Sequence, residues 1–105
     1  MNYILEGHKP VPIEDVIKWA KWLEANNDLT RVNRTRFLAD GIIRREDITI
    51  STVFLGLDYS FGEGPPLLFE TMIFGGEHDQ YQKRYVTWDE AEEGHKKAVA
   101  MVKES

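Results

Sequence analysis

The sequence contains no cysteine. A chain without cysteine forms no disulfide, and it offers no thiolate as a metal ligand or a nucleophile. A reducing cytoplasm is the compartment that suits this composition best. The chain also lacks any run of about 18 apolar residues, so we expect no membrane-spanning helix. Residues 1–9 lack the basic segment followed by an apolar one that a signal peptide has.

Positive charge is also scarce, because 13 basic residues stand against 18 acidic ones and the net charge is −5. An acidic chain is poorly suited to broad binding of nucleic-acid backbones, which needs a basic surface. The motifs of common enzymes are missing too. There is no G-x-S-x-G nucleophile elbow, no H-E-x-x-H zinc motif and no phosphate-binding loop. The sequence therefore predicts neither a catalytic residue nor a bound cofactor or metal.

What the chain does contain is two apolar runs, at residues 48–55 and 67–74, on either side of a loop rich in glycine and proline. β-branched and aromatic residues dominate both runs, which is typical of strands. Neither run alternates cleanly between apolar and polar residues, which predicts central strands with both faces partly covered. With 105 residues, we expect one domain spanning residues 1–105.

Helical patterns flank this pair of strands. Apolar residues recur at helical spacing over residues 13–25, where Pro12 suits the first turn. Residues 3–5 favour a short edge strand, and residues 83–86 a last one. Thr87 and Glu90 form a capping box that opens a helix over residues 88–102, with Gly94 marking close packing. We predict an α+β fold, an antiparallel sheet of three or four strands with both helices packed on one face.

Arginines are interleaved with strand-forming residues at positions 29–38. Arg31, Arg34 and Arg36 predict an edge strand, because exposed charge on an edge discourages pairing with other chains. Such an arginine strip is also suited to an anionic ligand or to an acidic patch on a partner. A solvated edge without a binding role is the alternative interpretation.

The polar residues within and around the apolar runs are candidates for a site. They are Asp58, Tyr59, Glu70, His78 and His95. Adjacent antiparallel strands would bring Asp58 close to Glu70, and His95 lies on the inner face of the last helix. Two carboxylates and a histidine can hold a divalent ion or divide acid and base roles. Alternatively, these residues are structural, because buried charges are usually paired. Asp58 then caps the loop, Glu70 pairs with an arginine such as Arg84, and His95 forms hydrogen bonds in the core.

Several of these segments resemble a family of small bacteriophage and prophage proteins. The similar segments are STVFLGLDY at 51–59, GPPLLFETMIF at 64–74, RYVTWDEA at 84–91 and the Gly94-His95 pair. The resemblance extends from about Val16 to Met101. In that family a histidine usually follows the aspartate that matches Asp58, whereas Tyr59 stands here. The resemblance implies a phage origin and a bacterial host cytoplasm, but no mechanism.

Three hypotheses follow. The leading one is a non-enzymatic binding protein that occupies a host protein, a defence-system protein or a small anionic ligand. Its predicted binding surfaces are the arginine strip and the loop at residues 58–66. The second is a metal-assisted hydrolase centred on Asp58, Glu70 and His95. The third is a homo-oligomeric structural or assembly component, such as a homodimer formed through an edge strand.

Overall fold

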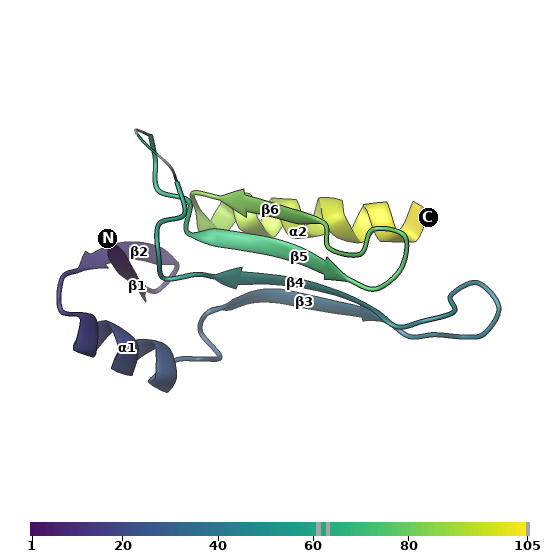
Figure 1. Ribbon diagram of the computed structural model, residues 1–105, viewed down its shortest axis with the longest axis horizontal. Helices are drawn as coiled ribbons and strands as arrows, with labels where there is room; N and C mark the ends of the chain where they lie inside the picture. Colours follow the sequence, from purple (N-terminus) through teal and green to yellow (C-terminus); the bar gives the residue numbers. More distant parts are fainter. Residues whose placement is uncertain (61, 63, 105) are drawn as a thin grey trace.

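The computed structural model describes residues 1–60, 62 and 64–104, and it confirms the α+β class. In chain order the elements are β1 (Asn2–Glu6), β2 (Lys9–Ile13), α1 (Val16–Ala25), β3 (Arg31–Phe37), β4 (Ile48–Phe54), β5 (Phe69–Phe74), β6 (Gln82–Tyr85) and α2 (Trp88–Glu104). Figure 1 shows two unequal parts. The β1–β2 hairpin and α1 lie at one end, and a longer sheet with α2 alongside makes up the rest.

The longer sheet has four antiparallel strands in the order β3-β4-β5-β6, and α2 packs on one face (Figure 1). β4 and β5 are neighbours at its centre, as predicted. Burial alternates along β4, with Ile50, Thr52 and Phe54 buried under α2 and the residues between them only half-buried. The two faces of these strands therefore differ. α2 covers one face, whereas the side chains of the other face are mostly half-buried and reach solvent, as the prediction of partly covered faces allows.

The N-terminal region differs from the prediction in two respects. Pro12 and Ile13 do not start a helix, because they pair with Tyr3 and Asn2 in the β1–β2 hairpin. Proline is tolerated there because an edge strand leaves some backbone N–H groups unpaired. The helix starts at Val16 instead, where the Asp15 carboxylate accepts hydrogen bonds from two N–H groups of the first turn.

The first helix also has a different position. α1 packs mainly against the β1–β2 hairpin rather than on the four-stranded sheet, so only α2 covers that sheet. Two tryptophans attach α1 to the rest of the chain. Trp19 donates a hydrogen bond to the Gly56 carbonyl (3.1 Å), and Trp22 meets the ring of Phe54 edge-on. Val16 and Ile17 stay exposed, because the short hairpin covers only one side of the helix.

Two apolar clusters form the core between α2 and the sheet. Phe54, Phe69 and Trp88 belong to the first, which also takes in Leu5 of the hairpin. The second cluster consists of Ile48, Ile50, Ile73, Ala98 and Val102. Thr52 follows Ile50 and precedes Phe54 on the covered face of β4, and Thr71 occupies the matching place on β5. A buried polar layer therefore separates the two clusters.

The start of α2 confirms the capping box. The Glu90 N–H donates to the Thr87 hydroxyl, and the Thr87 N–H donates to the Glu90 carboxylate, both at 3.1 Å. One turn further, Gly94 packs directly against the ring of Tyr85 on β6, so that a β-carbon at this position would overlap the ring. Close packing at Gly94 is thus also confirmed. Neither helix in the described part of the chain combines the length and the apolar character needed to cross a membrane.

Candidate binding surface

The face of the sheet opposite α2, here called the open face, carries its side chains in rows that cross the strands. Paired residues of antiparallel strands point to the same side, so the register defines these rows. The first row is Arg31, Val53, Glu70 and Arg84; the second is Arg34, Ser51, Met72 and Gln82; the third is Arg36, Thr49 and Phe74. Cations thus line the β3 edge, and apolar side chains (Val53, Met72, Phe74) alternate with polar ones (Thr49, Ser51, Glu70) in the middle of the face.

A β-bulge in β3 brings the three arginines to the same face. Arg31 pairs with Val53 and Asn33 pairs with Thr52, so Val32 is an extra residue in the ladder. Side chains alternate along a regular strand, and without the bulge Arg31 would point toward α2 while Arg34 and Arg36 point away. The extra residue shifts Arg31 by one position and allows Val32 to pack against the core. The edge-strand prediction for the arginine strip is confirmed.

The three arginines differ in their partners. Arg36 forms an ion pair with Asp47 at 3.3 Å, at the far end of β3. Arg31 and Arg34 have no carboxylate within ion-pair distance in the described part of the chain, and their guanidinium groups make no hydrogen bond there. Each guanidinium group carries five N–H donors. The two side chains therefore present unused donors and positive charge on an otherwise acidic protein.

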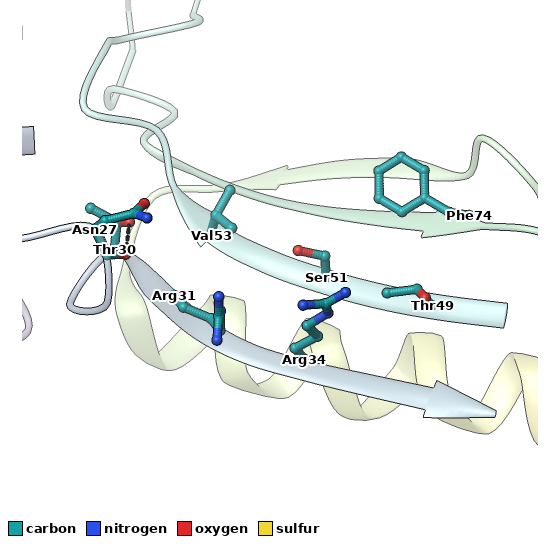
Figure 2. Close-up of a pocket in the computed structure, with 8 residues that line it drawn as sticks. All are labelled: Asn27, Thr30, Arg31, Arg34, Thr49, Ser51, Val53 and Phe74. Atoms are coloured by element: carbon teal, nitrogen blue, oxygen red, sulfur yellow. Dashed lines mark hydrogen bonds between the residues drawn. The ribbon is translucent and has the colours of Figure 1, made fainter. Parts of the chain in front are cut away.

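A shallow groove of about 400 Å³ lies beside these two arginines. Figure 2 shows Arg31 and Arg34 rising from β3 toward the side chains of β4, with Phe74 beyond them on β5. Thr49, Ser51, Val53, Asn27 and Thr30 complete the lining. Phe74 is 48% exposed, although it is a large apolar residue. The groove thus combines free cations, hydroxyl groups and an accessible aromatic ring.

The opposite end of the open face is already occupied by internal contacts. The Glu70 carboxylate accepts a hydrogen bond from Arg84 at 2.9 Å and another from Gln82. The guanidinium group of Arg84 also lies 4.6 Å from the ring centre of Tyr59. The paired-charge interpretation of Glu70 is therefore confirmed. Tyr59 joins the pair through its contact with Arg84. This cluster holds β5, β6 and the start of the loop at residues 58–66 together.

Asp58 has the structural role of capping that loop. Its carboxylate accepts hydrogen bonds from the N–H groups of Ser60 (2.8 Å) and Leu67 (3.0 Å), so it joins the two ends of the loop. These hydrogen bonds, with that of Ser60 the largest cause, lower the pKa of Asp58. Phe61 and Glu63, which belong to the loop predicted as a binding surface, lie outside the described residues.

His95 belongs to α2, faces the covered side of the sheet and is 1% exposed. Its Nδ1 is 2.7 Å from the hydroxyl of Thr52, and its Nε2 is 2.8 Å from the hydroxyl of Thr35. Thr52 in turn bonds to Thr71 at 2.6 Å. Every ring nitrogen thus has a partner, and none of these partners is charged. Burial lowers the pKa of His95, which favours the neutral ring.

The structure does not bring the proposed hydrolase residues together. His95 points from α2 into the core, Glu70 is on the open face, and Asp58 is turned into its own loop. His78 is in the turn between β5 and β6. Across residues 1–60, 62 and 64–104, no three histidine or acidic side chains are grouped so that they could hold a metal ion. The arrangement offers no shared centre for acid–base chemistry.

A second exposed feature was missed by sequence reasoning. The loop between β3 and β4, residues 38–47, projects beyond the end of the sheet (Figure 1). At its apex Ile42 is 89% exposed and Ile43 is 74% exposed. The Asp40-Gly41 pair is a turn signal, and the charged residues at 44–47 are typical of a solvated connection. The signal that would have identified the feature is the pair of isoleucines directly after Asp40-Gly41, where a turn leaves large apolar residues without a core to enter.

Comparison with known protein families, curated proteins and solved structures finds no match for this chain. The fold and the geometry of the open face are therefore the basis for the functional proposal.

Proposed function

We propose that this chain is a non-enzymatic binding protein that recognises an acidic surface of a partner protein through the open face. The observation that carries the proposal is the pair Arg31 and Arg34, two arginines with no acidic partner among the described residues, beside exposed Phe74. Arginine, methionine and aromatic residues are enriched in the centres of protein interfaces. The open face carries all three kinds, with Met72 between the arginines and Arg84.

The shape of the groove favours a protein over a small anionic ligand. Sites for small molecules are concave and bury most of the ligand. The groove beside Arg34 is shallow and open, and most of its lining side chains stand on β3 and β4 of the sheet (Figure 2). A shallow and open face suits the surface of a partner protein. The resemblance to phage proteins supports a host or defence-system protein in the bacterial cytoplasm as that partner.

The test is a double charge reversal, Arg31→Glu with Arg34→Glu, compared with Lys18→Glu and Lys21→Glu on the exposed side of α1. Each purified chain is used to capture proteins from a lysate of phage-infected bacteria, and the captured protein is then titrated in purified form. We expect the arginine variant to bind about tenfold more weakly or worse, with a reduced dependence on salt. The lysine variant should bind as the unmodified chain does.

Equal binding by both variants and the unmodified chain would remove the arginines from the interface. A small anionic ligand would be indicated if nucleotides raised the melting temperature of the unmodified chain but not that of the arginine variant. Light scattering separates the homodimer alternative, because two copies docked through the open face would show twice the mass of the chain.

A further inference from the structure

The loop at residues 38–47, here called the tip loop, has an internal hydrogen-bond network that fixes its shape. One carboxylate oxygen of Asp40 accepts hydrogen bonds from the N–H groups of Ile42, Ile43 and Arg44, at 2.8, 2.8 and 3.0 Å. The Arg44 carbonyl accepts two more, from Asp40 and Gly41. These bonds, led by the one from Ile42, lower the pKa of Asp40. The apex is therefore held in one conformation although it is exposed.

The base of the tip loop is attached to the sheet on both sides. Asp47 accepts a hydrogen bond from the Ala39 N–H at 2.8 Å and pairs with Arg36. Glu46 accepts one from the Gly76 N–H at 2.6 Å, which joins the loop to the turn after β5. The guanidinium group of Arg44 packs over the ring of Phe37, 4.6 Å from its centre. The loop is thus bonded to the end of the sheet at its base, although it contains no strand itself.

Rigid exposure of two isoleucines has no structural purpose within this chain. Burying an isoleucine side chain stabilises a protein, and Ile42 and Ile43 forgo most of this stabilisation in the isolated chain, where they are 89% and 74% exposed. A rigid apolar protrusion also loses little conformational entropy when it binds. We propose that the tip loop inserts Ile42 and Ile43 into a concave apolar pocket of a folded partner protein, with an acidic group at the rim facing Arg45.

The charges around the tip loop favour this partner over a membrane. Arg45 is exposed and has no ion-pair partner in the described part of the chain. Glu46 and Glu77 line the same groove of about 410 Å³ as Ile43 and Arg45. An anionic lipid surface would attract Arg44 and Arg45 but repel these two acids and the ionised Asp40, so the charges around the tip loop give it no net attraction. A protein pocket can place a single acidic group opposite Arg45 and keep the remaining acids in water.

The inference rests on the proposed function only in requiring a protein partner, and it uses a different surface. The experiment places the photocrosslinking residue p-benzoylphenylalanine at position 42 of the whole chain in phage-infected bacteria. Position 29 is the matched control, because Leu29 is also an exposed apolar residue, in the turn before β3. We expect at least tenfold more adduct with one other protein from position 42, with the crosslink mapping to an apolar pocket of that protein.

The crosslinked protein, in purified form, is then titrated with three variants of the chain. We expect Ile42→Ser with Ile43→Ser to weaken binding at least tenfold, Arg45→Glu to weaken it several-fold and Leu29→Ser to have no effect. Equal crosslinking from positions 42 and 29, an adduct of two copies of this chain, or tip-dependent binding to vesicles of phosphatidylethanolamine and phosphatidylglycerol would each overturn the inference.

The outcomes also separate the two surfaces. Loss of binding in the Arg31→Glu and Arg34→Glu variant, but not in the isoleucine variant, would leave the proposed function standing and overturn the role of the tip loop. The opposite pattern would support the tip loop and remove the open face from the interface.

Discussion

At the scale of single residues, the polar groups inside the sheet and helix are structural. His95 bridges Thr35 and Thr52 between two apolar clusters, and both of these hydrogen-bond partners are uncharged. A neutral imidazole fits this position, since one ring nitrogen donates and the other accepts. A buried and fully bonded polar layer of this kind fixes how α2 sits on the sheet, because a shifted helix would leave hydroxyl groups and ring nitrogens without partners.

The first prediction concerns the pH dependence of stability. Burial lowers the pKa of His95 below its ordinary value of 6.5, so the unfolded chain takes up a proton at a pH where the folded chain does not. Stability should therefore be fully present above about pH 6.5 and fall as the pH drops below it. The measurement is urea unfolding of the unmodified chain and of the His95→Gln variant from about pH 5 to about pH 8, a range that spans this pKa.

The His95→Gln variant is expected to be less stable at neutral pH, because glutamine does not match the geometry of the two threonine hydroxyls. Its stability should nevertheless depend less on pH in the acidic part of the range. If the free energies of unfolding of the two proteins instead ran parallel with pH, His95 would not be the titrating group.

The residue-scale predictions from sequence were right where chemistry left few options. A buried glutamate in an apolar strand is usually paired with a cation, and the interpretation in which Glu70 pairs with an arginine such as Arg84 is confirmed. The position of Arg31 and Arg34 on a common face of the sheet could not be predicted from the sequence. Their common face depends on the bulge at Val32, and no residue in that segment signals an insertion in the ladder.

At the scale of elements, α2, β1 and the four strands of the longer sheet could be predicted, whereas β2 and the start of α1 could not. The Thr87–Glu90 capping box is a local signal, and the apolar runs of β4 and β5 are long enough to be unambiguous. The sequence around Pro12 fits both a first helical turn and an edge strand. The hairpin forms because Tyr3 and Leu5 pair with this segment, a contact that helical periodicity does not reveal.

The element-scale prediction concerns the packing of α2 on β6. In Gly94→Ala the new β-carbon would overlap the ring of Tyr85, so the helix must shift or the ring must move. Overpacking costs about 1–3 kcal/mol, while alanine gains about 1 kcal/mol in helix propensity. We expect a net loss of stability in thermal unfolding, and Glu93→Ala on the exposed side of α2 should change little. A higher melting temperature for Gly94→Ala would show that α2 lies farther from β6.

At the scale of the whole molecule, the surfaces that pack together to stabilise the fold are separate from the surfaces that stay exposed for binding. One helix covers one face of the sheet, the other helix is held at the end by a hairpin, and the open face and the tip loop are left free (Figure 1). Both free surfaces lie along the β3–β4 hairpin, whose strands carry Arg31, Arg34 and Ser51 and whose loop carries Ile42. A single partner contacting this hairpin can therefore meet both surfaces.

The most direct test of the central claim is the reactivity of each arginine in the isolated chain, measured by phenylglyoxal labelling and mass spectrometry in dilute solution. The account predicts that Arg31 and Arg34 react faster than Arg84. Arg31 and Arg34 have no acidic partner in the part of the chain that the structure describes, whereas Arg84 is paired with Glu70 and packed against Tyr59. Protection of Arg31 and Arg34 to the level of Arg84 would mean that the open face is already covered, and it would contradict the account.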